Sequence, residues 1–384
     1  MSALVDASLL DDIKKFGAAD VSACFSCGNC TAICPLSSND GTFPRRMIRY
    51  AQVGMKDALL SSKELWTCYH CGMCSDTCPT QADPGGFMAA ARRYAIASYD
   101  HTRLAWTMYT KPVLASLFAI ALAAFFALFM YSEHGLQSRT AMALFGFIPE
   151  PLIHYTGLVV MILAFLFGLA GIVTMVRGIS RREVKLRGKS AVSGWKALWS
   201  AIGVESIGQK RYRQDCAAAQ EEKPWYRRRW LIHSLTMWGF LGLLVATVAD
   251  YGLSLIGVKM PGTPVPIWYP TRLLGTLAGL AMIYGVTMFF IDRVRKDNQS
   301  AKNSEPADWM LLVLLWIVGV TGFLIEISLY LPEPPAWGYW VFLFHVSVAM
   351  ELILLAPFMK FAHAIYRPVA LYYLARAGGE AGSD

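Results

Sequence analysis

Eight of the nine cysteines lie between Cys24 and Cys78, in two groups of identical spacing, Cys-x-x-Cys-x-x-Cys-x-x-x-Cys-Pro. Three cysteines at three-residue intervals wrap a loop around one 4Fe–4S cubane, while the fourth, followed by proline, reaches a second cubane. The spacing therefore predicts two clusters with crossed ligation. The predicted ligands are Cys24, Cys27, Cys30 and Cys78 for cluster 1, and Cys34, Cys68, Cys71 and Cys74 for cluster 2.

Zinc is the alternative metal, because it also binds four thiolates, but zinc sites normally use two separated cysteine pairs. Disulfides would need an oxidising compartment. The opening residues MSALVDASLLDDIKKFG lack a basic segment followed by an apolar one, so we expect no signal peptide. Clustered cysteines in a reducing compartment favour metal binding. The ninth cysteine, Cys216, stands alone and is given no role.

Four of the seven histidines, His154, His233, His345 and His363, lie in long apolar stretches. An imidazole in hydrocarbon is costly unless it is paired or ligated. His345 and His363 are 363 − 345 = 18 residues apart; on one helix this is five turns, with both rings on one face about 27 Å apart. We therefore predict two b-type haems, bound without covalent attachment because no Cys-x-x-Cys-His occurs. The alternative is that some of these histidines only pack between helices.

Three carboxylates, Asp250, Glu326 and Glu351, interrupt the same apolar stretches. Oxidation of a quinol releases protons, which a carboxylate in the site can accept. We predict a quinone pocket near the outer haem with Asp250 or Glu326 as proton acceptor. Alternatively, each carboxylate only stabilises a helix contact or faces a water pocket.

The elements that must hold these residues are helices in a membrane. Hydrophobic residues make up 55% of the chain, charged residues 16%, and mean hydropathy is +0.40. Six apolar stretches each reach the roughly 20 residues needed to cross the hydrocarbon layer. They cover 112–132, 152–176, 230–256, 271–292, 308–330 and 337–364.

The predicted fold class is mainly α: an N-terminal α-helical, ferredoxin-like domain for two clusters, followed by a six-helix transmembrane haem-binding bundle. Residues 84–111 mix apolar residues with arginine and lysine and predict an amphipathic helix leading to the membrane surface. The predicted divisions are 1–100 for the cluster domain, 101–111 for a membrane-surface connector, 112–367 for the bundle and 368–384 for a cytoplasmic tail.

The net charge of +8 is a topology signal. Residues 177–229 contain 14 Lys/Arg and 293–307 contain four, whereas 133–151 and 257–270 contain one each. This asymmetry predicts an inner-membrane protein with both termini in the cytoplasm, and argues against nucleic acid as a partner. The topology then pairs His154 with His345 at the outer side and His233 with His363 at the inner side.

The two cysteine groups followed by a histidine-bearing bundle resemble a fusion of two heterodisulfide reductase components, the iron–sulfur C subunit and the membrane cytochrome E subunit. This arrangement is similar to that of the quinone-interacting membrane-bound oxidoreductase family of sulfate-reducing bacteria, in its C subunit. The resemblance implies soluble flavin-binding iron–sulfur partner subunits and transfer of menaquinol electrons towards adenylylsulfate reductase in dissimilatory sulfate reduction. The spacing of His345 and His363 is also similar to that in the haem-binding subunit of respiratory nitrate reductase.

The residues favour a relay between a quinone and a soluble acceptor. No Gly-x-Gly-x-x-Gly follows a predicted strand, so flavin and the terminal acceptor are expected on other subunits. One alternative is the same architecture in a heterodisulfide or sulfite reductase-type complex, and another is a non-redox membrane anchor. Ion translocation is a third, but the spans contain few acidic or basic residues.

Overall fold

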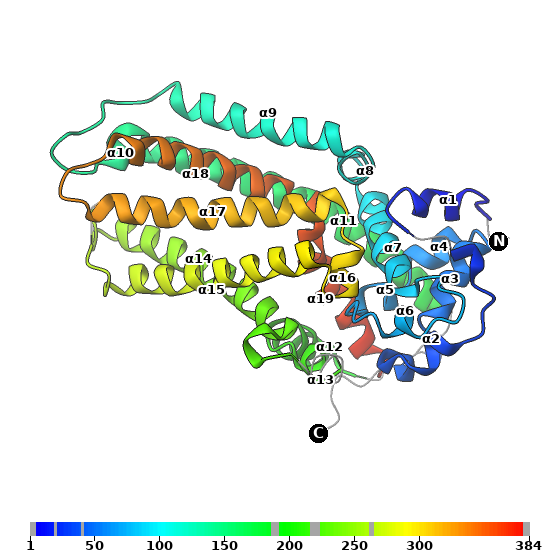
Figure 1. Cartoon of the computed structure of the whole chain (residues 1–384). Helices are drawn as coiled ribbons and strands as arrows, with labels where there is room; N and C mark the ends of the chain where they lie inside the picture. Colours follow the sequence, from blue (N-terminus) through cyan, green and yellow to red (C-terminus); the bar gives the residue numbers. More distant parts are fainter. Residues whose placement is uncertain are drawn as a thin grey trace.

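The computed structural model describes residues 5–18, 21–39, 42–185, 192–215, 223–260 and 265–378. Cys216 lies outside these residues. Within the described ranges the chain forms helices and no β-strand, which confirms the mainly α fold class. A small N-terminal domain lies against one end of a bundle of long helices (Figure 1).

The N-terminal domain is built from short helices around one long, buried helix, α7. Small residues such as Gly85, Gly86 and Ala90 let the neighbouring segments approach α7 closely, and Phe16 and Trp66 complete a continuous apolar core. The helices are α1 (Leu9–Lys14), α2 (Asn29–Ala32), α3 (Arg45–Gln52), α4 (Lys56–Leu60), α5 (Glu64–Thr67), α6 (Met73–Asp76), α7 (Pro84–Tyr99) and α8 (Leu104–Thr110).

The prediction of one amphipathic surface helix over residues 84–111 is wrong. Helix α7 ends at Tyr99, and its buried residues occupy nearly its whole circumference. Asp100 causes the break, because its carboxylate accepts hydrogen bonds from the backbone N–H groups of Thr102 and Ala105. Arg103, further along this turn, has a φ of 63° before α8 begins.

Among the described residues, six helices are long and apolar enough to cross a membrane, in agreement with the predicted number of spans. Three of them begin with proline, whose missing N–H and restricted φ suit the first helical position. The helices are α9 (Pro112–Tyr131), α11 (Glu150–Lys185), α14 (Arg229–Leu255), α15 (Pro270–Arg295), α17 (Pro306–Tyr330) and α18 (Ala336–Leu355), and a short helix, α10 (Leu144–Phe147), lies at the far end.

Helices α14 and α15 form a tight antiparallel pair that runs along the bundle (Figure 1). Their backbones approach at two glycines: a Cβ at Gly239 would lie 2.6 Å from the Ala278 carbonyl oxygen, and one at Gly285 would lie 2.7 Å from that of Ile232. Small residues of this kind allow close packing in lipid, where contact between helices depends on van der Waals fit.

The last predicted span is not one helix. Helix α18 ends at Leu355, and two short 3₁₀ turns flank extended backbone at Met359 before α19 (His363–Arg376) begins in a new direction (Figure 1). Pro357 lacks the N–H that a continuing helix would need. His345 and His363 therefore do not share a helix, and the five-turn argument for their alignment is wrong. The predicted boundary at residue 367 falls inside α19, which continues through residues 368–376 of the predicted cytoplasmic tail.

Part of the long basic segment after α11 is also helical. It contains α12 (Gly194–Trp199), a π-helix (Ser200–Ile207) and α13 (Lys210–Asp215). The π-helix packs on α19 at the end of the bundle nearest the N-terminal domain. A further short helix, α16 (Gln299–Lys302), contacts α7 from the loop between α15 and α17.

Candidate redox-cofactor sites

The two cysteine groups have the same local structure. Gly28 and Gly72, each between the second and third cysteine of its group, adopt φ values of 90° and 96°. This left-handed turn suits glycine, and it starts the short helices α2 and α6, which carry the third cysteines. The two helices pack together, and the Asn29 side-chain amide donates a hydrogen bond to the Thr77 carbonyl oxygen at 2.5 Å.

The first thiol set comprises Cys24, Cys27, Cys30 and Cys78. Burial and the charge of Cys24, followed by the charges of Cys27 and Cys78, raise the pKa of Cys30. Cys78 thus lies near the first cysteine group, although it belongs to the second group in sequence. Cys27 is exposed, and the neighbouring Phe25 side chain is 65% exposed, so this set lies at the solvent side of the domain.

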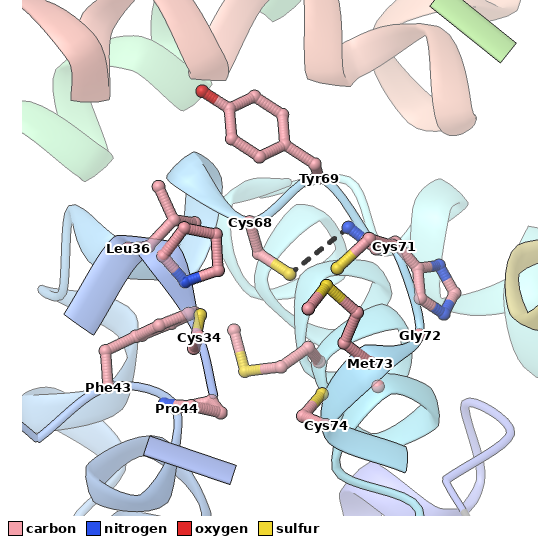
Figure 2. A pocket seen from close by; sticks show the side chains of 14 residues that line it. Cys34, Leu36, Phe43, Pro44, Cys68, Tyr69, Cys71, Gly72, Met73 and Cys74 are labelled. Carbon is pink, nitrogen blue, oxygen red and sulfur yellow. Dashed lines mark hydrogen bonds between the residues drawn. The ribbon is translucent and has the colours of Figure 1, made fainter. Parts of the chain in front are cut away.

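The second thiol set comprises Cys34, Cys68, Cys71 and Cys74, and all four residues line one cavity (Figure 2). Burial and the charges of Cys68 and Cys71 raise the pKa of Cys34 to about 12. The set therefore gathers the fourth cysteine of the first group with three of the second, as crossed ligation requires. A cubane binds one thiolate at each of four irons, and four thiols around one buried cavity fit that donor set.

Positively charged side chains surround the second thiol set on the side of the bundle. Arg92 and Arg367 both donate hydrogen bonds to the Cys68 carbonyl oxygen, at 2.8 and 3.3 Å. Arg229, at the start of α14, donates to the His70 carbonyl oxygen at 3.2 Å. Burial and then the charges of Arg92 and Arg229 lower the pKa of His70 well below its usual range, so its imidazole is neutral at physiological pH.

The structure brings His233 and His363 together at the end of the bundle nearest the N-terminal domain. Their ring centroids are 6.2 Å apart, with an angle of 64° between the ring planes. Two imidazoles bound to opposite sides of one metal, each at about 2 Å, would have centroids roughly 6 Å apart. The observed separation therefore fits a bis-histidine site.

Hydrogen bonds at Nδ1 hold both rings. His363 Nδ1 lies 2.6 Å from the Lys360 carbonyl oxygen, and His233 Nδ1 lies 3.2 Å from Gln209 Oε1. Both acceptors require the proton on Nδ1, which makes Nε2 the nitrogen able to bind iron. This arrangement is typical of metal-binding histidines, whose second ring nitrogen donates to a carbonyl or carboxylate.

The other two histidines lie towards the far end. His345 Nδ1 lies 2.8 Å from Thr321 Oγ1, whereas His154 stacks on Tyr251 with centroids 4.0 Å apart and has Nε2 3.4 Å from Glu150 Oε1. Gly157 packs against Met350, so α11 and α18 place the two histidines at similar depth. The two histidines nevertheless contact different residues. The His154 side chain would have to turn away from Glu150 before its Nε2 could bind iron. The pairing of His154 with His345 stays a prediction.

Two of the three membrane carboxylates have cationic partners. Asp250 lies 2.6 Å from Lys259 Nζ, and Glu326 lies 3.2 Å from Arg272 Nε. Each also accepts a hydrogen bond from a threonine of α15, Thr271 for Asp250 and Thr276 for Glu326. The third, Glu351, is 2% exposed, and its Oε1 has no hydrogen-bond partner within the described part of the chain.

Several residues of these sites were missed by the sequence analysis. Gln209 and Tyr212 belong to the long basic segment, which carries no apolar or metal-binding pattern. Arg367 had a usable signal, because it lies one helical turn after His363 and so shares its face. Its guanidinium lies 4.6 Å from the centre of the Tyr69 ring.

Comparison with known protein families identifies both halves of the chain. The profile described as "Citrate utilization protein B" matches residues 106–382, which is more than half of the chain. The chain belongs to the citrate utilization protein B family. The profile described as "4Fe-4S dicluster domain" matches residues 20–82, which include every cysteine of the two thiol sets.

Individual relatives match different parts of the chain. Citrate utilization protein B of Escherichia coli is 27% identical over 230 residues, which cover 58% of each chain. The C subunit of the H(2):CoB-CoM heterodisulfide,ferredoxin reductase of Methanothermobacter thermautotrophicus is 37% identical over 62 residues, covering 16% of this chain and 34% of the relative. The E subunit of the dihydromethanophenazine:CoB–CoM heterodisulfide reductase of Methanosarcina thermophila is 27% identical over 169 residues, covering 40% and 60%.

The chain thus spans less than two thirds of the length of each of these relatives. No solved structure matches it. The predicted likeness to the C and E subunits of heterodisulfide reductase is confirmed. Together with the six spans, the comparisons support a multi-pass membrane protein with an iron–sulfur electron-transfer role in an oxidoreductase complex.

Proposed function

We propose that this chain is the membrane subunit that oxidises menaquinol and delivers the electrons to soluble flavin-binding iron–sulfur subunits of the same complex. The observation that carries the proposal is the short contact path between the two kinds of site. Tyr69, next to Cys68, stacks on Tyr212 with centroids 5.6 Å apart, and Tyr212 contacts the edge of the His233 ring at the same distance. His363 follows at 6.2 Å.

The cofactor assignment follows from the donor groups. The first and second thiol sets would each hold one 4Fe–4S cluster, and His233 with His363 would hold a b haem at the cytoplasmic side. His154 with His345 would hold a second b haem at the outer side, after His154 turns away from Glu150. When bound, these groups supply one-electron redox centres whose potentials depend on ligand type and surrounding charge.

The order of the sites follows from their positions. The second thiol set contacts residues of the bundle through Arg367 and Arg229, whereas the first set lies on the solvent side beside the exposed Phe25. The second cluster would therefore be the neighbour of the inner haem, and the first would face the soluble partner. The basic segments at this end of the bundle support a cytoplasmic location for it, by the positive-inside rule.

The quinone pocket would lie near the outer haem, at the far end of the bundle. Tyr251, which stacks on His154, directly follows Asp250 in α14. Glu326 lies five residues after Thr321, the hydrogen-bond partner of His345, which is about 7.5 Å along α17. Both carboxylates are thus at a depth where they could accept protons from a quinol bound beside the outer haem.

The acceptor beyond the first cluster distinguishes the candidate complexes. The likeness to the quinone-interacting membrane-bound oxidoreductase family favours delivery towards adenylylsulfate reductase in dissimilatory sulfate reduction. Membership in the citrate utilization protein B family favours a second candidate, in which the same relay serves an enzyme of citrate utilisation. A third complex, with a heterodisulfide or sulfite reductase-type acceptor, fits the likeness to heterodisulfide reductase subunits.

Anaerobic spectroscopy of the purified complex tests the proposal. Iron, acid-labile sulfide and haem are counted per chain, and a menaquinol analogue is then added. The proposal expects reduced b-haem absorption bands followed by reduction of both clusters. Bound zinc in place of iron, or a protein without haem, contradicts it and favours a membrane anchor. Identification of the co-purified subunits separates the candidate acceptors.

A further inference from the structure

Gln209 occupies a constrained position between the π-helix and α13. Its side chain is 4% exposed, and its backbone has a φ of 50°, a left-handed conformation that glutamine rarely adopts. Its Oε1 accepts hydrogen bonds from His233 Nδ1 and Ser234 Oγ, at 3.2 and 3.3 Å. Its Nε2 donates to Met237 Sδ at 3.4 Å. The buried amide is therefore fixed at both ends, with its oxygen directed at the His233 ring.

Tyr212 contacts the same histidine from the same segment. Its ring meets that of His233 at 69°, with centroids 5.6 Å apart, and it stacks on Tyr69 at 30° and the same distance. Figure 2 shows the Tyr69 side chain pointing away from the cysteine sulfurs, out of the cavity. Tyr212 thus lies between the loop of the second thiol set and His233.

We propose that the segment Gln209–Tyr212 is a positioning element for His233: Gln209 sets its tautomer and basicity, and Tyr212 sets the plane of its ring. This inference rests on the proposed function, because it assigns His233 as a haem ligand. An acceptor at Nδ1 increases electron donation from Nε2 to iron and so stabilises the ferric form. The ring plane matters because the magnetic anisotropy of a low-spin ferric haem depends on the angle between its two imidazoles.

Substitutions of Gln209 test the first half of the inference. Gln209→Leu keeps the side-chain size and removes the acceptor, so the midpoint potential of the inner haem should shift to a more positive value. Gln209→Glu keeps an acceptor oxygen, so its potential should stay at or below that of the unchanged protein. Equal potentials in all three proteins, or a negative shift in the leucine variant, would overturn the role of Gln209.

Substitutions of Tyr212 test the second half by electron paramagnetic resonance of the oxidised protein. Tyr212→Phe keeps the ring contact and should preserve the ferric signal of the inner haem. Tyr212→Leu removes the ring and should shift its largest g value. Tyr226→Leu is the matched control, because Tyr226 is an exposed aromatic residue of the same basic segment. Identical spectra in Tyr212→Leu and the control contradict the inference.

These experiments separate failure of the inference from failure of the proposed function. A purified protein without any bis-histidine haem signal contradicts the proposed function itself. A normal inner-haem signal that is insensitive to Gln209→Leu and Tyr212→Leu contradicts only the positioning role. Haem content per chain is measured for every variant, so that loss of haem from a misfolded variant is recognised. In that case the potential of Gln209→Glu and the ferric signal of Tyr212→Phe decide instead.

Discussion

Arg93 of α7 and Asp308 of α17 form a buried ion pair between the N-terminal domain and the bundle, with 2.5 Å between Arg93 Nη2 and Asp308 Oδ2. Arg93 also donates to the Phe16 carbonyl oxygen, and Lys360 Nζ lies 3.4 Å from Asp308 Oδ1. One carboxylate thus neutralises cations from two other segments. The ion pair joins the N-terminal domain to the bundle.

Removal of this carboxylate should loosen the junction. Asp308→Asn leaves the buried Arg93 and the partly exposed Lys360 without their anion, and loss of one partner of a buried pair such as Arg93–Asp308 costs about 3–5 kcal/mol. We expect a lower unfolding temperature in detergent and faster proteolysis between α8 and α9. Asp12→Asn is the control, because its pair with Lys15 is at the surface and contributes about 0–1 kcal/mol. An unchanged unfolding temperature in Asp308→Asn would show that the pair is not needed for docking.

Crossed ligation predicts that Cys78 acts with the first cysteine group. Cys78→Ser should change the same cluster signal as Cys27→Ser, and Cys74→Ser should change the other one. The physical reason is that the charge of Cys78 acts on Cys30, whereas Cys74 lines the cavity of the second thiol set. Iron content and low-temperature electron paramagnetic resonance of the reduced protein measure the effect. A Cys78→Ser spectrum that matches Cys74→Ser would disprove the crossed arrangement.

The inner haem should depend equally on its two imidazoles. His233→Ala and His363→Ala should each remove the same component of the reduced absorption spectrum, because both rings would bind one iron. His134→Ala is the control, since this ring stacks on Tyr131 at 4.0 Å at the far end of the bundle. Haem per chain is measured by pyridine haemochrome. Full haem content in either inner variant contradicts the assignment.

The outer carboxylates should affect quinol oxidation more than haem binding. Asp250→Asn and Glu326→Gln remove a proton acceptor and leave Lys259 or Arg272 without its anion. We expect a slower rate of haem reduction by a menaquinol analogue, with the haem spectrum unchanged. Glu333→Gln, at an exposed position of the α17–α18 loop, is the control. If the double variant reduces its haem at the original rate, the protons leave by another group.

The sequence predicted the fold well wherever one physical pattern dominated. Apolar length alone identified the six spans, because a helix is the form in which a single lipid-exposed segment satisfies its backbone hydrogen bonds. The cysteine spacing predicts that the fourth cysteine of each group reaches the other cubane, and Cys34 lines one cavity with three cysteines of the second group. The metal content of these sites stays a prediction.

The predicted helix boundaries were wrong where a single residue ends a helix inside an apolar stretch. Pro357 ends α18 inside an apolar stretch, and Asp100 ends α7 by capping its own turn. Gln209 and Tyr212 could not be found from the sequence, because only tertiary contacts connect them to His233. His154 illustrates a different limit: hydrophobicity predicts its depth, but Glu150, one helical turn away, takes up its Nε2.

The turn that separates α18 from α19 has a consequence for how the protein matures. Through α19, His363 is tied to the N-terminal domain, since Arg367 donates to the Trp66 and Cys68 carbonyl oxygens and Tyr366 packs against Trp66. Under the proposed assignment, insertion of haem at His363 and insertion of a 4Fe–4S cluster at Cys68 therefore depend on the same contacts. In a chain cut between α8 and α9, the residues of α19 that contact the loop of the second thiol set would lie on the other fragment from its cysteines.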